Sequence, residues 1–279
     1  MPAWSTKSSG GGWTRSGVAD PTDLLAFALS LADEADAITL PAFLDGVEAH
    51  AKADGTPVTV ADTAVEQTIR QRIGAAFPDH GILGEEMGAE PGRGGARWII
   101  DPIDGTVNFT RRIAVWATLI AVEQNGDLVA AVVSSPALSQ RWSAGRGIGA
   151  RTIHFGRERL IRVSDVRRLA EAQVVHAGVG AMEREGMGPG LWQVLHQSKR
   201  DRGFGDALGY MLVAQGSADV MVETKVKPWD LAGPAMIVTE AGGRFTDVAG
   251  GPGYTGPTAL ATNGHLHDEL VRVLAETQV

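Results

Sequence analysis

The sequence predicts a mixed α/β fold, of the α+β type in its first part and with alternating strands and helices after about residue 150. Two β-rich runs flank Asn125-Gly126, a dipeptide typical of a tight β-hairpin. Amphipathic helical patterns precede this hairpin, and shorter strand and helix patterns alternate after it. These observations together predict helices packed against an antiparallel sheet, followed by a smaller α/β part.

The first part begins with a helical pattern at Thr22, in which apolar residues share one face and acidic residues lie opposite. A second helix is predicted over residues 61–76, with Thr63 and Glu66 as a capping box at its start. A short strand that leads to Glu85 follows this helix. Strands of one antiparallel sheet are predicted over 115–123, 127–134 and 142–146.

The second part contains four strand patterns and four helix patterns in alternation. The strands are predicted over 174–177, 218–223, 244–248 and 259–262, and the helices over 189–197, 206–215, 230–241 and 267–276. We therefore divide the chain into an α+β part, residues 21–148, and an α/β part, residues 149–279. Residues 1–20 are rich in serine and glycine, and we predict that they form a disordered leader.

The composition excludes several classes of protein. The chain has 279 residues and a formal net charge of −8, which argues against non-specific nucleic-acid binding. It has no cysteine, so disulfides, thiolate metal sites and cysteine nucleophiles are excluded. No apolar run approaches the roughly 20 residues of a membrane span, and no signal-peptide pattern stands at the start. We expect a cytoplasmic protein without a nucleic-acid or membrane partner.

The segment from Trp98 to Thr106 has the features of a cation site. An apolar run typical of a buried strand ends in two carboxylates three residues apart, Asp101 and Asp104. Gly105 and Thr106 follow directly and offer backbone N–H groups and a hydroxyl. Mg²⁺ binds carboxylate and carbonyl oxygens while keeping water and substrate phosphate in its shell. The pattern therefore predicts a cation site next to a phosphate-binding loop.

Two other segments supply further carboxylates. Glu85 and Glu86 follow a short apolar strand pattern, and Asp230 precedes a run of small and apolar residues that suits a packed helix. A pair of divalent ions about 3.5–4 Å apart clamps both the attacking and the leaving oxygen in phosphate-ester chemistry. Such a pair needs several acidic ligands, and Glu85, Asp101, Asp104 and Asp230 provide four.

These three motifs, Gly84-Glu85-Glu86, the segment from Asp101 to Thr106, and Trp229 to Gly233, resemble the signatures of the inositol monophosphatase superfamily. The resemblance covers residues 22–275 and implies a layered αβαβα sandwich. It also implies a Mg²⁺-dependent phosphate monoester hydrolase with two to three ions per site, acting on a small phosphorylated metabolite by direct attack of a metal-activated water. Family members are commonly homodimers, so we expect a homodimer.

The resemblance assigns roles to individual residues. The metal ligands are Glu85, Asp101, the backbone carbonyl of Ile103, Asp104 and Asp230, with Asp101 bridging two ions. Gly105 and Thr106 present N–H groups to the phosphate, and the Thr106 hydroxyl and Asp62 orient or deprotonate the attacking water. Glu86 and Lys52 are placed near the metals. Each of Asp62, Glu86 and Lys52 also has a simpler interpretation, as a helix cap or a solvated surface residue.

Within the superfamily, several segments resemble the histidinol-phosphate phosphatase branch, among them Gly205-Asp206 and the stretch 261–269. Histidinol phosphate carries an ammonium and an imidazole far from its phosphate, so its pocket should contain acids away from the metals. Asp206 and Glu223 lie in segments that form the substrate side in the family. A cap at the start of helix 206–215 is the alternative role of Asp206.

Three features depart from that branch: Val107 stands where a basic residue is expected, Ser143 where an aromatic one is expected, and 176–188 lacks a serine-rich loop. An inositol, sugar or aminocyclitol phosphate therefore stays open as the substrate. A regulatory protein on an inactive phosphatase scaffold is a third hypothesis. The presence of all four metal carboxylates and Thr106 argues against it.

Overall fold

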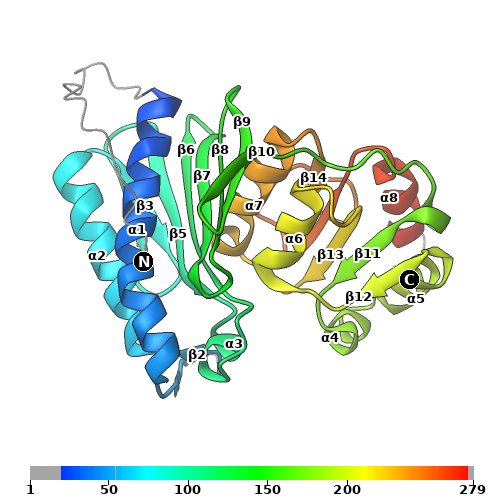
Figure 1. Ribbon diagram of the computed structural model, residues 1–279, viewed down its shortest axis with the longest axis horizontal. Coiled ribbons are helices and arrows are strands. Elements are labelled where there is room, and N and C mark those ends of the chain that lie inside the picture. Colours follow the sequence, from blue (N-terminus) through cyan, green and yellow to red (C-terminus); the bar gives the residue numbers. More distant parts are fainter. Residues whose placement is uncertain (1–19, 54, 276–279) are drawn as a thin grey trace.

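The computed structural model describes residues 20–53 and 55–275 of the chain. The predicted disordered leader lies outside these residues except for Asp20, whose carboxylate accepts the N–H of Thr22 at 2.8 Å and caps the first helix. Figure 1 shows five layers in the order helices, sheet, helices, sheet, helices. The predicted α/β fold and its αβαβα layering are therefore confirmed. Within the described residues, no helix is both long and apolar enough to cross a membrane.

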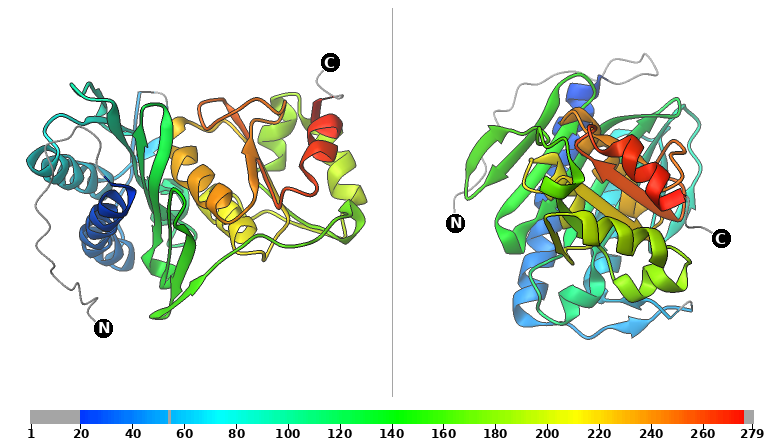
Figure 2. Two further views of the ribbon diagram at one scale, coloured as in Figure 1. Left: turned by 90° about the horizontal axis from the view of Figure 1, so that it is seen from above. Right: turned by 90° about the vertical axis from the view of Figure 1, so that its right-hand side faces the viewer.

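The first layer consists of α1 (Pro21–Asp45) and α2 (Val60–Ala76), which pack side by side on the outer face of the larger sheet (Figures 1 and 2). Thr59 caps α2, and the Asp62 carboxylate accepts the Thr59 backbone N–H at 2.8 Å. The capping box predicted at Thr63 and Glu66 is therefore wrong. The cap is Thr59 and the helix begins at Val60, so Thr63 and Glu66 lie inside the helix.

The larger sheet has the strand order β10-β9-β8-β7-β6-β5-β3-β4. Its strands are β3 (Gly81–Gly84), β4 (Gly88–Glu90), β5 (Ala96–Asp104), β6 (Ala117–Gln124), β7 (Asp127–Ser135), β8 (Gln140–Gly145), β9 (Gly149–His154) and β10 (Arg157–Leu160). Asn125 and Gly126, both with positive φ, form the predicted turn between β6 and β7. A separate small hairpin joins β1 (His50–Ala51) to β2 (Pro57–Val58).

One strand pair departs from the predicted antiparallel sheet and positions the site. β3 runs parallel to β5, with Gly84 opposite Ile100, because the β4 hairpin turns the chain back before β5 begins. The carboxyl ends of parallel neighbours lie at the same edge of a sheet. Glu85, directly after β3, is thereby placed next to Asp101 near the end of β5.

The smaller sheet has the order β12-β11-β13-β15-β14 and is mixed parallel and antiparallel. Its strands are β11 (Gln173–His176), β12 (Arg200–Arg202), β13 (Val220–Thr224), β14 (Arg244–Thr246) and β15 (Thr258–Thr262). The remaining helices are α3 (Thr106–Thr110), α4 (Val179–Arg184), α5 (Gly188–Gln197), α6 (Asp206–Ala214), α7 (Pro228–Glu240) and α8 (His267–Ala275). All eight elements predicted in the second part are present, with ends shifted by no more than two residues.

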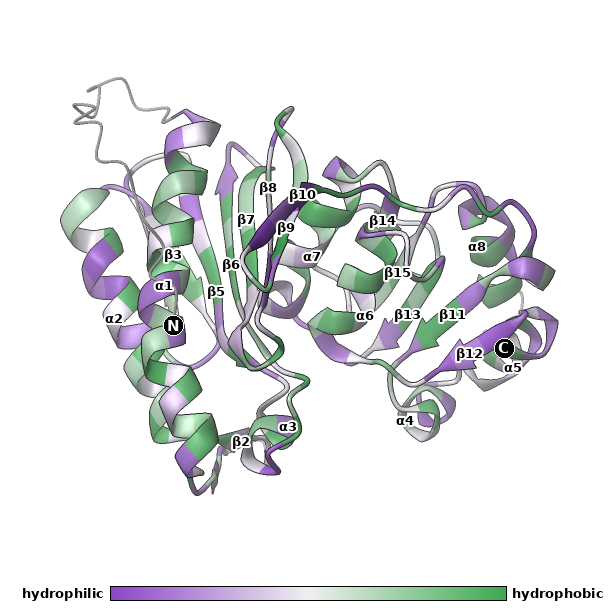
Figure 3. Cartoon of the chain, viewed as in Figure 1, coloured by the Kyte–Doolittle hydropathy of each residue, from purple (hydrophilic) through white to green (hydrophobic). Residues whose placement is uncertain are grey.

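The main core lies between the two sheets. Buried side chains of β5 to β9 pack there against α6 and α7, while α4, α5 and α8 cover the far face of the smaller sheet. Figure 3 shows apolar central strands and hydrophilic edge strands β10 and β12, whose charged residues discourage pairing with another chain. The larger sheet runs on to Leu160, and the division of the chain at residues 148 and 149 stays a prediction.

Candidate active site

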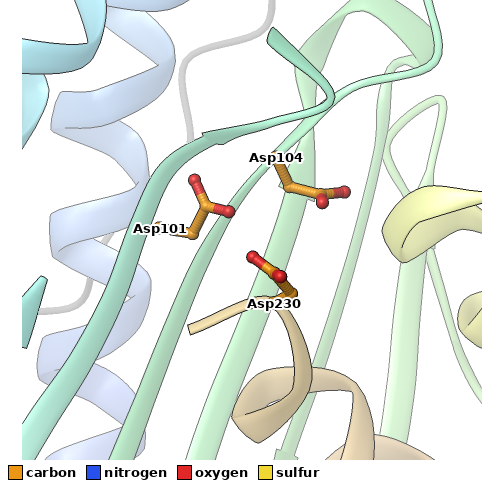
Figure 4. Close-up of side chains that lie close together, drawn as sticks. All are labelled: Asp101, Asp104 and Asp230. Carbon is orange, nitrogen blue, oxygen red and sulfur yellow. The ribbon is translucent and has the colours of Figure 1, made fainter. Parts of the chain in front are cut away.

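Three carboxylates meet where the larger sheet faces the start of α7. Carboxylate oxygens of Asp101, Asp104 and Asp230 all lie within 4.8 Å of one another, and Figure 4 shows the three side chains converging. Asp101 and Asp104 belong to β5, and Asp230 lies in the first turn of α7. The sequence predicted this convergence across about 130 residues of chain.

Local irregularity in β5 turns both of its aspartates toward one point. The register between β5 and β6 shifts between Asp101 and Asp104. Within this bulge, Asp101 Oδ1 accepts the N–H of Ile103 at 3.0 Å, and the Pro102 carbonyl accepts the Thr118 hydroxyl at 2.8 Å. In a regular strand, residues three apart point to opposite faces. The bulge therefore allows Asp101 and Asp104 to share a site.

Asp230 is positioned by the start of its helix. The helix begins at Pro228, two residues before the predicted start, so Asp230 occupies its third position. There Asp230 Oδ2 accepts the N–H of Lys227 at 2.7 Å. This bond fixes the carboxylate at the amino end of α7, where negative charge is favoured.

Glu85, Glu86 and Lys52 form an ion-pair group next to this cluster. Lys52 Nζ lies 2.7 Å from Glu85 Oε1 and 2.8 Å from Glu86 Oε1. Burial opposes the charged form of Lys52, but the two carboxylates outweigh it and raise its pKa. Burial raises the pKa of Glu86 to about 7 although Lys52 opposes the shift. The structure thus places Lys52 beside the predicted metal ligand Glu85.

The two residues expected to handle the attacking water are both buried. The Thr106 hydroxyl donates to the Ile103 carbonyl at 3.0 Å, the same carbonyl that the resemblance assigns to a metal. Asp62 Oδ2 accepts bonds from the N–H and hydroxyl of Thr59. Asp62 Oδ1 is buried and has no hydrogen-bond partner among the described residues. Burial raises the pKa of Asp62, and the nearby charge of Glu85 adds to the shift.

Gly105 links the carboxylate strand to α3 in a conformation that suits glycine. Its φ is +82°, in the left-handed region. A Cβ at this position would lie 3.1 Å from the Val115 carbonyl oxygen and 3.4 Å from Asp206 Oδ2. The backbone of this loop therefore closely approaches the segment just before β6 and the first residue of α6.

The other wall of the site comes from the second half of the chain. Asp206, the first residue of α6, has a φ of +55° and accepts a bond from Asn108 Nδ2 at 2.9 Å. Glu223, at the end of β13, accepts the Tyr210 hydroxyl at 2.8 Å. Asp104 Oδ2 accepts the N–H of Ala207 at 2.7 Å and connects this wall to β5.

The carboxylates of the site repel one another, and a bound cation would neutralise them. Burial raises the pKa of Asp101 and Asp104 strongly, and the neighbouring acids raise both further. Burial also raises the pKa of Asp230 to about 7 and that of Glu223 to about 8. Buried like charges at this spacing are unfavourable unless a counter-ion neutralises them. This set of hard oxygen donors fits a divalent ion such as Mg²⁺.

The residues surround an open, concave cleft, the kind of site in which small molecules bind. Of the predicted site residues, Lys52, Asp62 and Glu86 stand outside its lining, and all the others line it. Sequence reasoning missed four contributors: Tyr210, Thr224 and Lys225, which line the cleft, and Asn108, which holds Asp206. One feature of the sequence could have indicated Asn108: it lies two residues after Thr106, next to the predicted phosphate-binding loop.

Comparison with known proteins agrees with this geometry. The model of the inositol monophosphatase family matches residues 20–278. The chain belongs to the inositol monophosphatase family. Among curated relatives, the histidinol-phosphatase of Mycobacterium tuberculosis is 44% identical over 252 residues, covering 89% of this chain and 96% of the relative. The fructose-1,6-bisphosphatase/inositol-1-monophosphatase of Thermotoga maritima is 35% identical over 221 residues, with coverages of 78% and 82%.

Solved structures share the fold. The extragenic suppressor protein suhB from Bartonella henselae superposes with a TM-score of 0.82 at 30% identity, over 90% of this chain and 98% of that one. An inositol monophosphatase from Anabaena superposes with a TM-score of 0.78 at 28% identity, over 92% and 96%. The family and its named relatives make this chain a phosphatase, a hydrolase of phosphate esters. The predicted resemblance and enzyme class are confirmed.

Proposed function

We propose that the protein is a Mg²⁺-dependent phosphatase that hydrolyses histidinol phosphate to histidinol and phosphate. One observation supports the choice of substrate: the half-buried Asp206 and the buried Glu223 line the wall of the cleft that comes from the second half of the chain. Three relatives named histidinol-phosphatase, 38% to 44% identical to this chain, support it.

The residues that would hold Mg²⁺ are Glu85, Asp101, the Ile103 carbonyl, Asp104 and Asp230, for two to three ions. When bound, such ions lower the pKa of a water molecule and neutralise charge on the phosphate and the leaving oxygen. The orphaned Asp62 Oδ1 and the Thr106 hydroxyl are suited to accept hydrogen bonds from the attacking water and to orient it. The loop at Gly105 and Thr106 presents backbone N–H groups to the phosphate oxygens.

Charge in the cleft favours a substrate with a cationic end. Among the described residues, six carboxylates and one lysine, Lys225, line the cleft. With all of these ionised, two divalent ions would leave an excess of one negative charge before the substrate enters. An ammonium or imidazolium group close to Asp206 and Glu223 would neutralise this excess. A neutral inositol or sugar ring would leave it unpaired.

A second candidate is another small phosphate ester, of inositol, a sugar or an aminocyclitol. Val107, exposed on α3 next to the phosphate loop, favours it because a basic residue is expected there in histidinol-phosphate phosphatases. Similarity to inositol-1-monophosphatases, such as the one from Rhizobium meliloti at 35% identity, also favours it.

The deciding experiment is phosphate release with Mg²⁺ from L-histidinol phosphate, inositol 1-phosphate, fructose 1,6-bisphosphate and an aminosugar phosphate. We expect kcat/KM for histidinol phosphate to exceed the others by about a hundredfold, equivalent to roughly 2.7 kcal/mol. A flat profile would assign the protein to the second candidate. The absence of Mg²⁺-dependent release from every ester would instead favour a regulatory role.

A cytoplasmic location and a homodimeric state complete this proposal, and both are supported by the family resemblance alone. Light scattering coupled to gel filtration would test the second. A mass near twice the 29.3 kDa of one chain supports the homodimer, and a mass of one chain contradicts it.

A further inference from the structure

Helix α2 carries a row of polar residues on its inner face. Asp62, Glu66 and Arg70 are four residues apart, a spacing that places side chains above one another on one side of a helix. Asp62 and Glu66 are fully buried, in a helix whose other buried residues are apolar. A buried carboxylate is costly unless hydrogen bonds and a counter-charge compensate it. The partners of Glu66 therefore indicate what it does.

Those partners belong to the turn that contains Glu85 and Glu86. Glu66 Oε2 accepts the N–H of Glu86 at 2.8 Å, and Glu66 Oε1 accepts the N–H of Met87 at 3.1 Å. Arg70 compensates the charge, with Nε 2.9 Å from Glu66 Oε1. The Arg70 guanidinium also donates to the Gly88 carbonyl. One helix face thus holds two residues of the turn between β3 and β4 and the first residue of β4.

Gly84 makes this close approach possible. A Cβ at Gly84 would lie 2.0 Å from Glu66 Oε1 and 2.8 Å from Glu66 Oε2. Any side chain there would push the carboxylate away from the turn. The glycine that precedes the two glutamates is therefore required by the buried carboxylate of α2.

We propose that Glu66 is a positioning residue, which fixes the Glu85–Met87 turn so that the Glu85 carboxylate is held ready for a metal ion. The inference rests on the proposed metal role of Glu85. Glu85 itself is anchored by its N–H to the Ile100 carbonyl of β5 and by Lys52 to its carboxylate. Glu66 secures the chain on the other side of that residue.

The expected size of the effect follows from the bonds lost. Replacing the carboxylate by the amide of Gln leaves one acceptor oxygen for the two part-buried N–H groups and removes the charge that pairs with Arg70. Loss of a group that orients a metal ligand commonly weakens metal affinity by about 10–100-fold. We therefore expect Glu66 to act mainly on Mg²⁺ affinity.

The test compares Glu66→Gln with two control variants of the same helix. Gln67→Ala changes an exposed neighbour, and Ile69→Val removes one buried methylene without touching the turn. Mg²⁺ binding is measured by titration calorimetry on the full chain, and thermal unfolding without metal reports stability. We expect Glu66→Gln to weaken Mg²⁺ binding about tenfold or more, whereas Ile69→Val loses stability and keeps its Mg²⁺ affinity.

The possible results distinguish the positioning role of Glu66 from general destabilisation and from a failure of the proposed metal chemistry. If wild type binds Mg²⁺ and Glu66→Gln binds it equally well, the positioning role is wrong while the proposed function stands. If Ile69→Val weakens binding as much as Glu66→Gln does, general destabilisation explains the loss and the positioning role is again wrong. If wild type binds no Mg²⁺, the proposed metal chemistry fails and the inference fails with it.

A second variant, at the last residue of β3, tests the same contact from the other side. Gly84→Ala should weaken Mg²⁺ binding as Glu66→Gln does, because its Cβ displaces the carboxylate. Combined in one chain, the two changes should weaken binding by no more than about the larger single effect, since both break one interaction. Full additivity of the two effects on Mg²⁺ affinity would overturn the proposed coupling.

Discussion

Asn108 Nδ2 donates a hydrogen bond to Asp206 Oδ2 at 2.9 Å, and so joins α3 to the first residue of α6 across 98 positions of the chain. The same amide donates to the Val115 carbonyl, also at 2.9 Å. Two acceptors thus fix the Asn108 side chain, which in turn fixes the orientation of Asp206. One oxygen of Asp206 is engaged by this bond, which leaves the other for a ligand in the cleft.

This contact predicts how Asn108→Ala changes substrate affinity. Burial raises the pKa of Asp206, and the bond from Asn108 opposes that shift. Without the amide, the Asp206 carboxylate loses a hydrogen bond that favours its charged form and fixes its orientation. We expect KM for histidinol phosphate to rise about tenfold, the value of one hydrogen bond to a charged group. KM for inositol 1-phosphate serves as the control, and an equal rise for both esters would contradict the role of Asp206.

The metal-free protein should lose stability as the pH rises from 6.5 to 8.5. Burial raises the folded-state pKa of Asp230 to about 7 and of Glu223 to about 8, so the folded chain retains protons that the unfolded chain releases. Their stabilisation is complete below the unfolded pKa values near 4 and is lost through pH 7 and 8. Thermal unfolding in a chelator should show this fall, and saturating Mg²⁺ should reduce it. A melting temperature without metal that is flat or rises would be inconsistent with these shifts.

His267 does not change the stability over this pH range, because its stabilisation is lost only at lower pH. Its ring is buried between the hydroxyls of Thr246 and Thr262, and burial lowers its pKa to about 4. An imidazole whose folded pKa is lowered gives stability that is complete above its unfolded value of about 6.5 and is lost as the pH falls toward 4. Its contribution is therefore constant above pH 6.5, where the carboxylates titrate.

Asp101→Asn should separate stability from function. The substitution removes one of several mutually repelling buried charges, so the metal-free protein should melt at a higher temperature than wild type. At saturating Mg²⁺, kcat should fall by about a thousandfold, because charge stabilisation by a metal is worth several kcal/mol and each 1.36 kcal/mol is tenfold. Unfolding curves and phosphate release on the same preparation check both. A variant that is less stable without metal would show that Asp101 is not under electrostatic repulsion.

Gly105→Ala should reduce both stability and turnover. The left-handed φ of +82° costs a residue with a Cβ about 1–2 kcal/mol. The added Cβ would also meet the Val115 carbonyl at 3.1 Å. We expect a loss of that size in denaturant unfolding together with a lower kcat. Gly126→Ala is the control, because its φ is +88° with nothing within 4 Å of the Cβ, so it should lose similar stability and keep kcat.

Several elements could be predicted from the sequence because their signals are local. Asn125-Gly126 identified the β6–β7 hairpin, and the apolar run that ends at Asp101 identified β5. The stacking of sheets and helices in five layers depends on long-range packing, and only the family resemblance indicated it. The capping box at Thr63 and Glu66 was misplaced because the same pattern, a threonine followed three positions later by an acid, also occurs at Thr59 and Asp62, four positions earlier.

The sequence by itself determined the chemistry of this protein: the acidic motifs, their order, and the glycines at positions 84 and 105 that let the backbone approach closely. Tertiary structure decided which of these groups meet. The parallel pairing of β3 with β5 brings Glu85 beside Asp101, and α2 places Glu66 behind that turn. Such contacts depend on strand order and helix packing between segments far apart in the chain. These contacts form only when the chain is folded, so they cannot be predicted from a local pattern of residues.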